Sequence, residues 1–190
     1  LYKNQNTYLT ELMNRPFPTK HLGEYTVPAK LADFINCWGD SRNSNAPYRK
    51  STDYCATKND IYINSYLSTG TIRYNHIYFE DKDMGRFRFY KLIGSYFGNP
   101  STSLASSKDD FTEYSCKTDY VTHKMITFKT AFCLRQYKKF EGLYDMVLTA
   151  ATLNENNKSL VTTLVLAGVS YENAAKFSKH YLGSFLWKRP

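Results

Sequence analysis

The chain has 190 residues, of which 42% are hydrophobic and 22% are charged. This composition excludes a disordered chain and is sufficient for one domain with a hydrophobic core. Lysine and arginine outnumber aspartate and glutamate by 25 to 17, giving a net charge of +8. Such a balance is compatible with nucleic acid, anionic lipid or another anionic polymer as a partner, but the basic residues are spread along the whole chain, as they also are on a surface that is merely solvated. No apolar run approaches the roughly 20 residues that span a bilayer as a helix. The chain does not begin with methionine and its first residues contain no signal-peptide core, so we expect any export signal to lie outside this chain.

The first third of the chain is predicted to be helical and rich in loops. Residues 7–14 have the composition of a short helix that stops before Pro16, and segments 17–28 and 40–55 are expected to be connectors. Between them, one apolar helix face is indicated by the spacing of Leu31, Phe34, Ile35 and Trp38. Residues 1–190 are therefore interpreted as a single domain, in which residues 1–58 could form a helical lobe beside a core of sheet and helix over 59–190.

The middle of the chain is predicted to contain a hairpin followed by a helix. Residues 61–66 and 71–79 are rich in β-branched and aromatic residues, and the LSTG sequence between them is typical of a turn. Asp81 and Asp83 are expected in a charged turn. The segment FRFYKLIGSYFG then has a helical apolar face that ends at Gly98.

The last third carries the strongest strand signals. Residues 126–134 alternate between apolar and polar side chains. Residues 146–153 and 160–169 are two apolar runs joined by the polar turn NENNKS, and neither run alternates cleanly, which predicts a central hairpin covered on both faces. Ser170 is a candidate helix cap, followed by an apolar stripe of Ala174, Phe177, Tyr181 and Phe185. The predicted fold is therefore α+β, with an antiparallel sheet of about five strands and helices packed on one face.

Four cysteines bear on the cellular compartment, and none of them forms a C-x-x-C pair, which argues against zinc. Their spacing suggests two local disulfides, Cys37–Cys55 and Cys116–Cys133, although three connectivities are open. Such crosslinks indicate an oxidising compartment, periplasmic or extracellular. The alternative is four buried free thiols in a cytosolic protein.

No recognisable catalytic motif is present, and neither a metal nor a cofactor is expected. The sequence Gly39-Asp40-Ser41 is followed by Arg42 rather than by the glycine of trypsin-like enzymes, and no G-x-S-x-G, H-E-x-x-H or phosphate-binding loop occurs. A hydrolase with an unfamiliar motif remains an alternative, and its weak candidates are Glu141, Asp145 and His180.

Two segments interleave basic and aromatic residues, TGTIRYNHIYF and CLRQYKKF. We expect a binding surface there, and a second alternative is stacking of nucleic-acid bases on an exposed aromatic sheet face. The candidate binding residues are Arg73, Tyr74, His76, Arg135, Tyr137, Lys138 and Lys139.

Three runs, STGTIRYNHIYF, AFCLRQYKKFEGLYDMVLTAATLN and LVLAGVSYENAAKFSKHYL, together resemble a region of exported proteobacterial proteins that can accompany a trypsin-like peptidase domain. The resemblance would cover most of residues 9–187. It implies an exported, non-catalytic accessory domain that binds a protein or a cell-envelope component, and no catalytic residue carries over because the peptidase motifs are absent.

Overall fold

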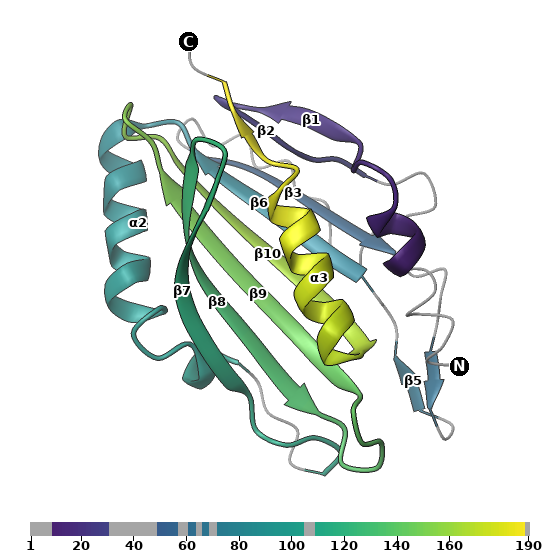
Figure 1. Cartoon of the computed structure of the whole chain (residues 1–190). Coiled ribbons are helices and arrows are strands. Elements are labelled where there is room, and N and C mark those ends of the chain that lie inside the picture. The colour runs from purple at the N-terminus through teal and green to yellow at the C-terminus, as the bar shows by residue number, and fades with distance from the viewer. Residues whose placement is uncertain are drawn as a thin grey trace.

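A six-stranded antiparallel sheet forms the centre of the molecule, with the strand order β3-β6-β10-β9-β8-β7 (Figure 1). The computed structural model describes residues 9–30, 49–56, 61–63, 66–68, 72–104 and 109–188. The strands of this sheet are β3 (Arg49–Ala56), β6 (Ile72–Phe79), β7 (Ser115–His123), β8 (Ile126–Gln136), β9 (Tyr144–Leu153) and β10 (Ser159–Val169). The α+β class with an antiparallel sheet is thus confirmed, with six strands in place of about five.

Smaller elements surround this sheet. Residues 9–13 are helical. The remaining elements are β1 (Thr19–Leu22), β2 (Tyr25–Pro28), β4 (Ile61–Ile63), β5 (Tyr66–Ser68), α2 (Lys82–Ser95), the short 3₁₀ helix η1 (Pro100–Ser103), α3 (Tyr171–Leu182) and β11 (Leu186–Trp187). None of the described helices combines the length and the apolar character needed to cross a bilayer.

The predicted central hairpin is formed by β9 and β10, in a register that places Leu164 opposite Leu148 and Val165 opposite Val147. The leucine pair belongs to the apolar cluster beneath α3, whereas the valine pair belongs to the cluster beneath α2. Both faces of the hairpin are therefore covered, which explains why its two strands lack a clean alternation of apolar and polar residues.

α3 covers one face of the sheet, as predicted. The Ser170 side chain accepts a hydrogen bond from the Asn173 amide and caps the helix, and the predicted stripe packs inward because Ala174, Phe177, Tyr181 and Phe185 are buried. Leu9 and Leu12 of the N-terminal helical residues and Tyr25 and Val27 of β2 complete this cluster.

The two helices lie on opposite faces, which corrects the expectation that helices pack on one face. In Figure 1, α2 lies behind the sheet and α3 in front of it, and Leu92, Ile93 and Phe97 pack against the second apolar cluster. α2 also begins earlier than predicted, because Asp81 is its N-cap and accepts a hydrogen bond from the Met84 amide at 2.8 Å. Apolar residues at consecutive positions of β9 and β10 require a cover on each face, and α2 supplies the second one.

The N-terminal part contains strands where connectors were expected. Residues 19–28 form the β1–β2 hairpin, whose turn uses Gly23 with a φ of +58°, a conformation that glycine adopts readily. Residues 49–56 form β3, which pairs with β6 along its whole length. The predicted hairpin between residues 61–66 and 71–79 is not formed. β6 pairs with β3 and β10, whereas β4 pairs with β5 in a separate two-stranded sheet. The helix predicted around 31–38 and the Gly39-Asp40-Ser41 turn lie outside the described residues.

One predicted crosslink is confirmed: Cys116 of β7 and Cys133 of β8 form a disulfide between directly opposed residues. It closes a loop with a sequence separation of 17, which stabilises the fold by about 3 kcal/mol in the chain-entropy picture. Cys37 and the side chain of Cys55 lie outside the described part of the chain, so that pairing stays a prediction.

Candidate functional site

The structure buries several of the side chains predicted to form a binding surface. Tyr74, His76 and Tyr137 are buried and cannot contribute the exposed contacts that the sequence suggested. Tyr74 and His76 both point towards α3, because alternate residues of β6 face the cluster beneath that helix.

His76 belongs to a buried polar network rather than to a surface. Its Nε2 lies 2.9 Å from the Pro28 carbonyl oxygen, and its Nδ1 lies 2.9 Å from Thr162 Oγ1. A carbonyl can only accept, so the neutral ring carries its proton on Nε2. Thr162 also bonds the Tyr181 hydroxyl. Burial lowers the pKa of His76 to about 4, so the imidazole is uncharged in the folded protein at neutral pH.

The remaining predicted residues do not converge on one surface. Arg73 is exposed on β6, whereas Lys138 and Lys139 are exposed in the turn after β8, and β10 and β9 lie between those two strands. Arg135 is partly buried and forms an ion pair with Asp145 at 3.2 Å. Its guanidinium also lies 3.8 Å from the centre of the Phe111 ring. Arg135 therefore stabilises the fold instead of presenting a free charge.

The two basic-aromatic segments do not form the exposed aromatic sheet face that would stack nucleic-acid bases. Four of the five aromatic residues of these segments are buried, namely Tyr74, Tyr78, Phe79 and Tyr137, and the fifth, Phe140, is partly buried. Tyr74 and Tyr78 pack in the apolar cluster beneath α3, whereas Tyr137 packs with Phe111 and Leu143 in a separate cluster.

The three hydrolase candidates do not form a shared site. Asp145 is held by Arg135, by the Tyr137 hydroxyl at 2.7 Å and by the Gly168 amide at 3.0 Å. His180 donates from Nε2 to the Arg15 carbonyl at 3.0 Å, and Glu141 is exposed in the β8–β9 turn. No hydrogen bond or ion pair within the described segments joins any two of the three. Those segments also contain no cluster of three or more metal-binding side chains.

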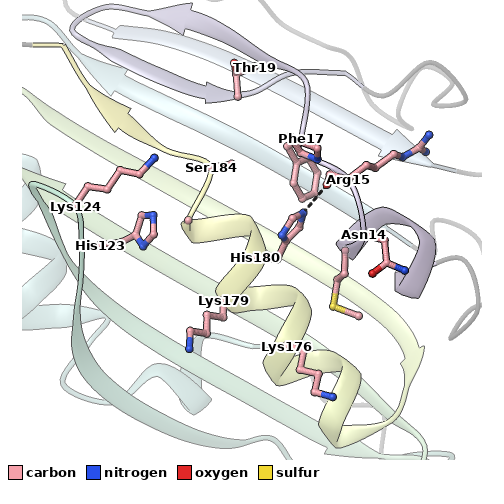
Figure 2. Close-up of a pocket in the computed structure, with 13 residues that line it drawn as sticks. Asn14, Arg15, Phe17, Thr19, His123, Lys124, Lys176, Lys179, His180 and Ser184 are labelled. Atoms are coloured by element: carbon pink, nitrogen blue, oxygen red, sulfur yellow. Dashed lines mark hydrogen bonds between the residues drawn. The ribbon is translucent and has the colours of Figure 1, made fainter.

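A surface hollow beside α3 gathers basic side chains that the sequence did not connect (Figure 2). It has a volume of about 900 Å³ and is open to solvent. We call it the α3 hollow. Its lining residues are Met13, Asn14, Arg15, Pro16, Phe17, Thr19, His123, Lys124, Lys176, Lys179, His180, Gly183 and Ser184. Four of these are lysine or arginine and none is acidic, so the hollow favours an anionic ligand.

Three separate segments bring the positive charges together. Arg15 follows the N-terminal helical residues, Lys124 lies in the β7–β8 turn with a φ of 56°, and α3 contributes Lys176 and Lys179. In Figure 2, Lys124 and Lys179 extend from the β7–β8 turn and from α3 on the same side of His180, whereas Arg15 points to the other side. The positive charges are therefore spread over a broad surface and do not converge on a single binding position.

Most of this charge is uncompensated. Within the described part of the chain, Arg15, Lys124 and Lys179 have no ion-pair partner, and all three are exposed. Lys176 is the exception, because it pairs with Glu172 one helical turn earlier at 2.6 Å. That contact lowers the pKa of the exposed Glu172 carboxyl through its hydrogen bond and charge interaction with Lys176.

Two histidines line the hollow. The His180 ring packs against the buried Phe17 ring, with 5.4 Å between the ring centres, and is oriented by its bond to the Arg15 carbonyl. His123 lies beside Gly183, where an added Cβ would come within 3.4 Å of the imidazole. Its buried Nε2 has no hydrogen-bond partner among the described residues. The hollow thus has an aromatic floor with polar nitrogen atoms beside its lysines.

Lys176, Lys179 and His180 lie off the apolar stripe that the sequence predicts for the last helix, but no local pattern links them to Arg15 or Lys124. These two residues are far from α3 in the sequence. The one sequence feature that could have indicated this hollow is the group Lys176, Lys179 and His180 on the last helix. Such a group also occurs where positive charge merely favours the C-terminal end of a helix.

Comparison with known proteins gives no family. No protein-family model matches the chain, and no curated protein matches it. Among solved structures, the Ran-binding protein Mog1p of Saccharomyces cerevisiae is 10% identical, with 90% of this chain and 96% of that chain covered and a TM-score of 0.40. A point mutant of Mog1 gives the same values. At this TM-score the likeness supports no conclusion about function, and the predicted resemblance to a region of exported proteobacterial proteins stays a prediction.

Proposed function

We propose that the protein is a non-catalytic interaction domain that binds an acidic surface of a protein partner through the α3 hollow. The observation that carries this proposal is the set of exposed, unpaired charges on Arg15, Lys124 and Lys179, which come from three separate segments. Like charges gathered on one surface repel each other, and a carboxylate-rich partner would relieve that repulsion.

The shape of the hollow supports a macromolecular partner. Small-molecule sites are enclosed and bury most of the ligand, whereas the α3 hollow is wide and open, with its lysines at the surface. The buried Phe17 ring and the partly buried Met13 supply an apolar floor between the charges. An apolar centre within a polar rim is the usual composition of a protein–protein contact surface.

A labelled oligoglutamate peptide is a direct probe of the proposed site, with binding followed by fluorescence anisotropy at low salt. The double variant Lys124→Glu/Lys179→Glu should weaken binding by about tenfold or more, because two attractive charges become repulsive. Lys139→Glu is the matched control, since it reverses an exposed lysine in the β8–β9 turn. An equal loss of affinity per reversed charge in Lys139→Glu would show nonspecific attraction and overturn the proposal.

The same assay distinguishes the nucleic-acid alternative. Single-stranded DNA of matched charge should bind no more tightly than the peptide if the site recognises acidic protein surfaces. Tighter binding of DNA that is lost in Lys124→Glu/Lys179→Glu would instead favour a phosphate polymer as the ligand.

We propose further that the protein acts outside the cytoplasm, in the periplasm or as a secreted domain, and that its partner belongs to the cell envelope. The Cys116–Cys133 disulfide supports this compartment, because such crosslinks persist in oxidising environments. Mass spectrometry of alkylated protein from the native host should find both cysteines oxidised. If both cysteines were instead found alkylated, they would be free thiols in the host, and the disulfide would no longer support an oxidising compartment.

A further inference from the structure

β7 forms one edge of the six-stranded sheet and is open to solvent along most of its length (Figure 1). Seven of its nine residues are exposed, and the other two, Cys116 and His123, are partly exposed. Exposed apolar surface accompanies this edge: the Tyr120 side chain is 60% accessible and Tyr171, at the start of α3, is 59% accessible. A long uncovered edge strand is a template for pairing with another strand.

The pairing geometry shows which backbone groups of β7 face outward. Cys116 and its partner Cys133 have Cα atoms 4.0 Å apart, which identifies a pair that exchanges no backbone hydrogen bonds. Cys116, Thr118, Tyr120 and Thr122 therefore direct their amides and carbonyls away from β8. The Tyr120 amide fits this assignment, because it donates to its neighbour Asp119 Oδ1 at 2.8 Å. No backbone hydrogen bond to another described element reaches these outward groups.

We propose that the outer edge of β7 pairs antiparallel with β7 of a second copy of this chain, centred on Thr118. In this register the two Thr118 residues lie on the two-fold axis, and Cys116 lies opposite Tyr120 of the partner subunit. Lys117 then lies opposite Asp119 of the partner subunit, and Asp119 lies opposite Lys117 of the partner subunit. Directly opposed residues of unlike charge stabilise an antiparallel pair.

The alternative registers lack this charge match. To form hydrogen bonds, the outward-facing residues of one β7 must lie opposite outward-facing residues of the other. The alternative registers therefore move the residue on the two-fold axis one position at a time along β7. Centring the pair on Asp119 would place the two Asp119 carboxylates opposite each other, which is destabilising. Centring it on Tyr120 would place Lys117 opposite His123 of the partner subunit and leave Asp119 opposite an apolar valine. The short sequence Lys117-Thr118-Asp119 is therefore complementary to itself in one register.

Pairing would also give hydrogen-bond partners to the polar groups at this edge and cover its exposed apolar surface. The Asp119 carboxylate, which accepts from the Tyr120 amide in the single chain, would turn to Lys117 of the partner subunit. The Tyr120 amide would then donate to the Cys116 carbonyl of the partner subunit. The Tyr120 ring would pack beside the partner's Cys116, which covers apolar surface that is now exposed.

Sedimentation velocity of Lys117→Asp, Asp119→Lys and the unmodified chain tests this arrangement. The unmodified chain should dimerise with increasing concentration, and each variant should dimerise roughly tenfold more weakly, because two attractive pairs become two repulsive pairs. An equimolar mixture of the two variants should form a heterodimer, because every Asp then faces a Lys. Lys139→Asp is the charge-matched control and should dimerise like the unmodified chain.

A cysteine crosslink tests the register independently of charge. Thr118→Cys should form a covalent dimer under mild oxidation, because the two residues face each other on the axis. Thr122→Cys should not, because its partner position is residue 114. An unmodified chain that remains monomeric at the highest soluble concentration would overturn the proposal, and so would a variant mixture that shows no heterodimer. Binding of oligoglutamate at the α3 hollow would be unaffected by either result.

Discussion

Replacing Asp145 with alanine should reduce the free energy of unfolding by about 3 kcal/mol or more, because it removes one partner of a largely buried ion pair. The carboxylate accepts hydrogen bonds from the Tyr137 hydroxyl at 2.7 Å and the Gly168 amide at 3.0 Å, in addition to its ion pair with Arg135. Alanine would leave all three donors without this acceptor. Urea unfolding at neutral pH measures the loss.

Glu141→Ala is the matched control for this prediction. Glu141 carries the same charge in the turn that leads to β9 but is exposed, so its removal should change the stability by no more than about 0.5 kcal/mol. A loss below about 1 kcal/mol for Asp145→Ala would mean that the three contacts contribute little beyond a single ordinary hydrogen bond.

The protein should lose stability on acidification because of His76. Burial lowers the pKa of this histidine from 6.5 to about 4 in the folded state. Between these values the unfolded chain binds a proton that the folded chain does not, so stability rises with pH. The contribution is complete above the unfolded pKa and is lost as pH falls through this window, with a total of about 3 kcal/mol.

Comparison with His76→Gln isolates this effect, because glutamine does not titrate in the window. Chemical unfolding of both proteins at pH 7 and pH 4.5 gives two differences in stability. The unmodified protein should lose on the order of 2–3 kcal/mol more than the variant over this interval. The absolute stability of the variant is not the readout, since glutamine changes the bonds to Pro28 and Thr162. Parallel pH profiles would show that His76 is not held neutral by the fold.

The parts of the fold that could be predicted are those with a regular apolar period. The β9–β10 hairpin and α3 were predicted because apolar runs of strand length and a four-residue stripe leave few alternatives. β3 was missed because its sequence RKSTDYCA is polar and contains no apolar alternation. Its position is set by pairing with β6, which is a long-range contact that no local pattern encodes.

The candidate site was less predictable than the fold. Tyr74 and His76 have the composition of a binding surface, but the register of β6 turns both towards α3. Conversely, Arg15 and Lys124 appear as isolated charges, and only the folding of the chain brings them beside Lys179. Residue type indicated positive charge correctly, but tertiary structure decided which charges share a surface.

The order of strands has a consequence for assembly of the chain. β7, β8, β9 and β10 follow one another as neighbours joined by short turns, so this meander requires only local loop closure. β6 instead joins β10 with Phe79 beside Ser159, and this seam closes the longest loop of any pairing in the large sheet. Closing that loop costs conformational entropy, which is offset by the pairing of β6 with β10 and by the packing of β6 beneath α3 and the β1–β2 hairpin. We therefore expect the β7–β10 meander to form before β6 pairs with β10 during folding.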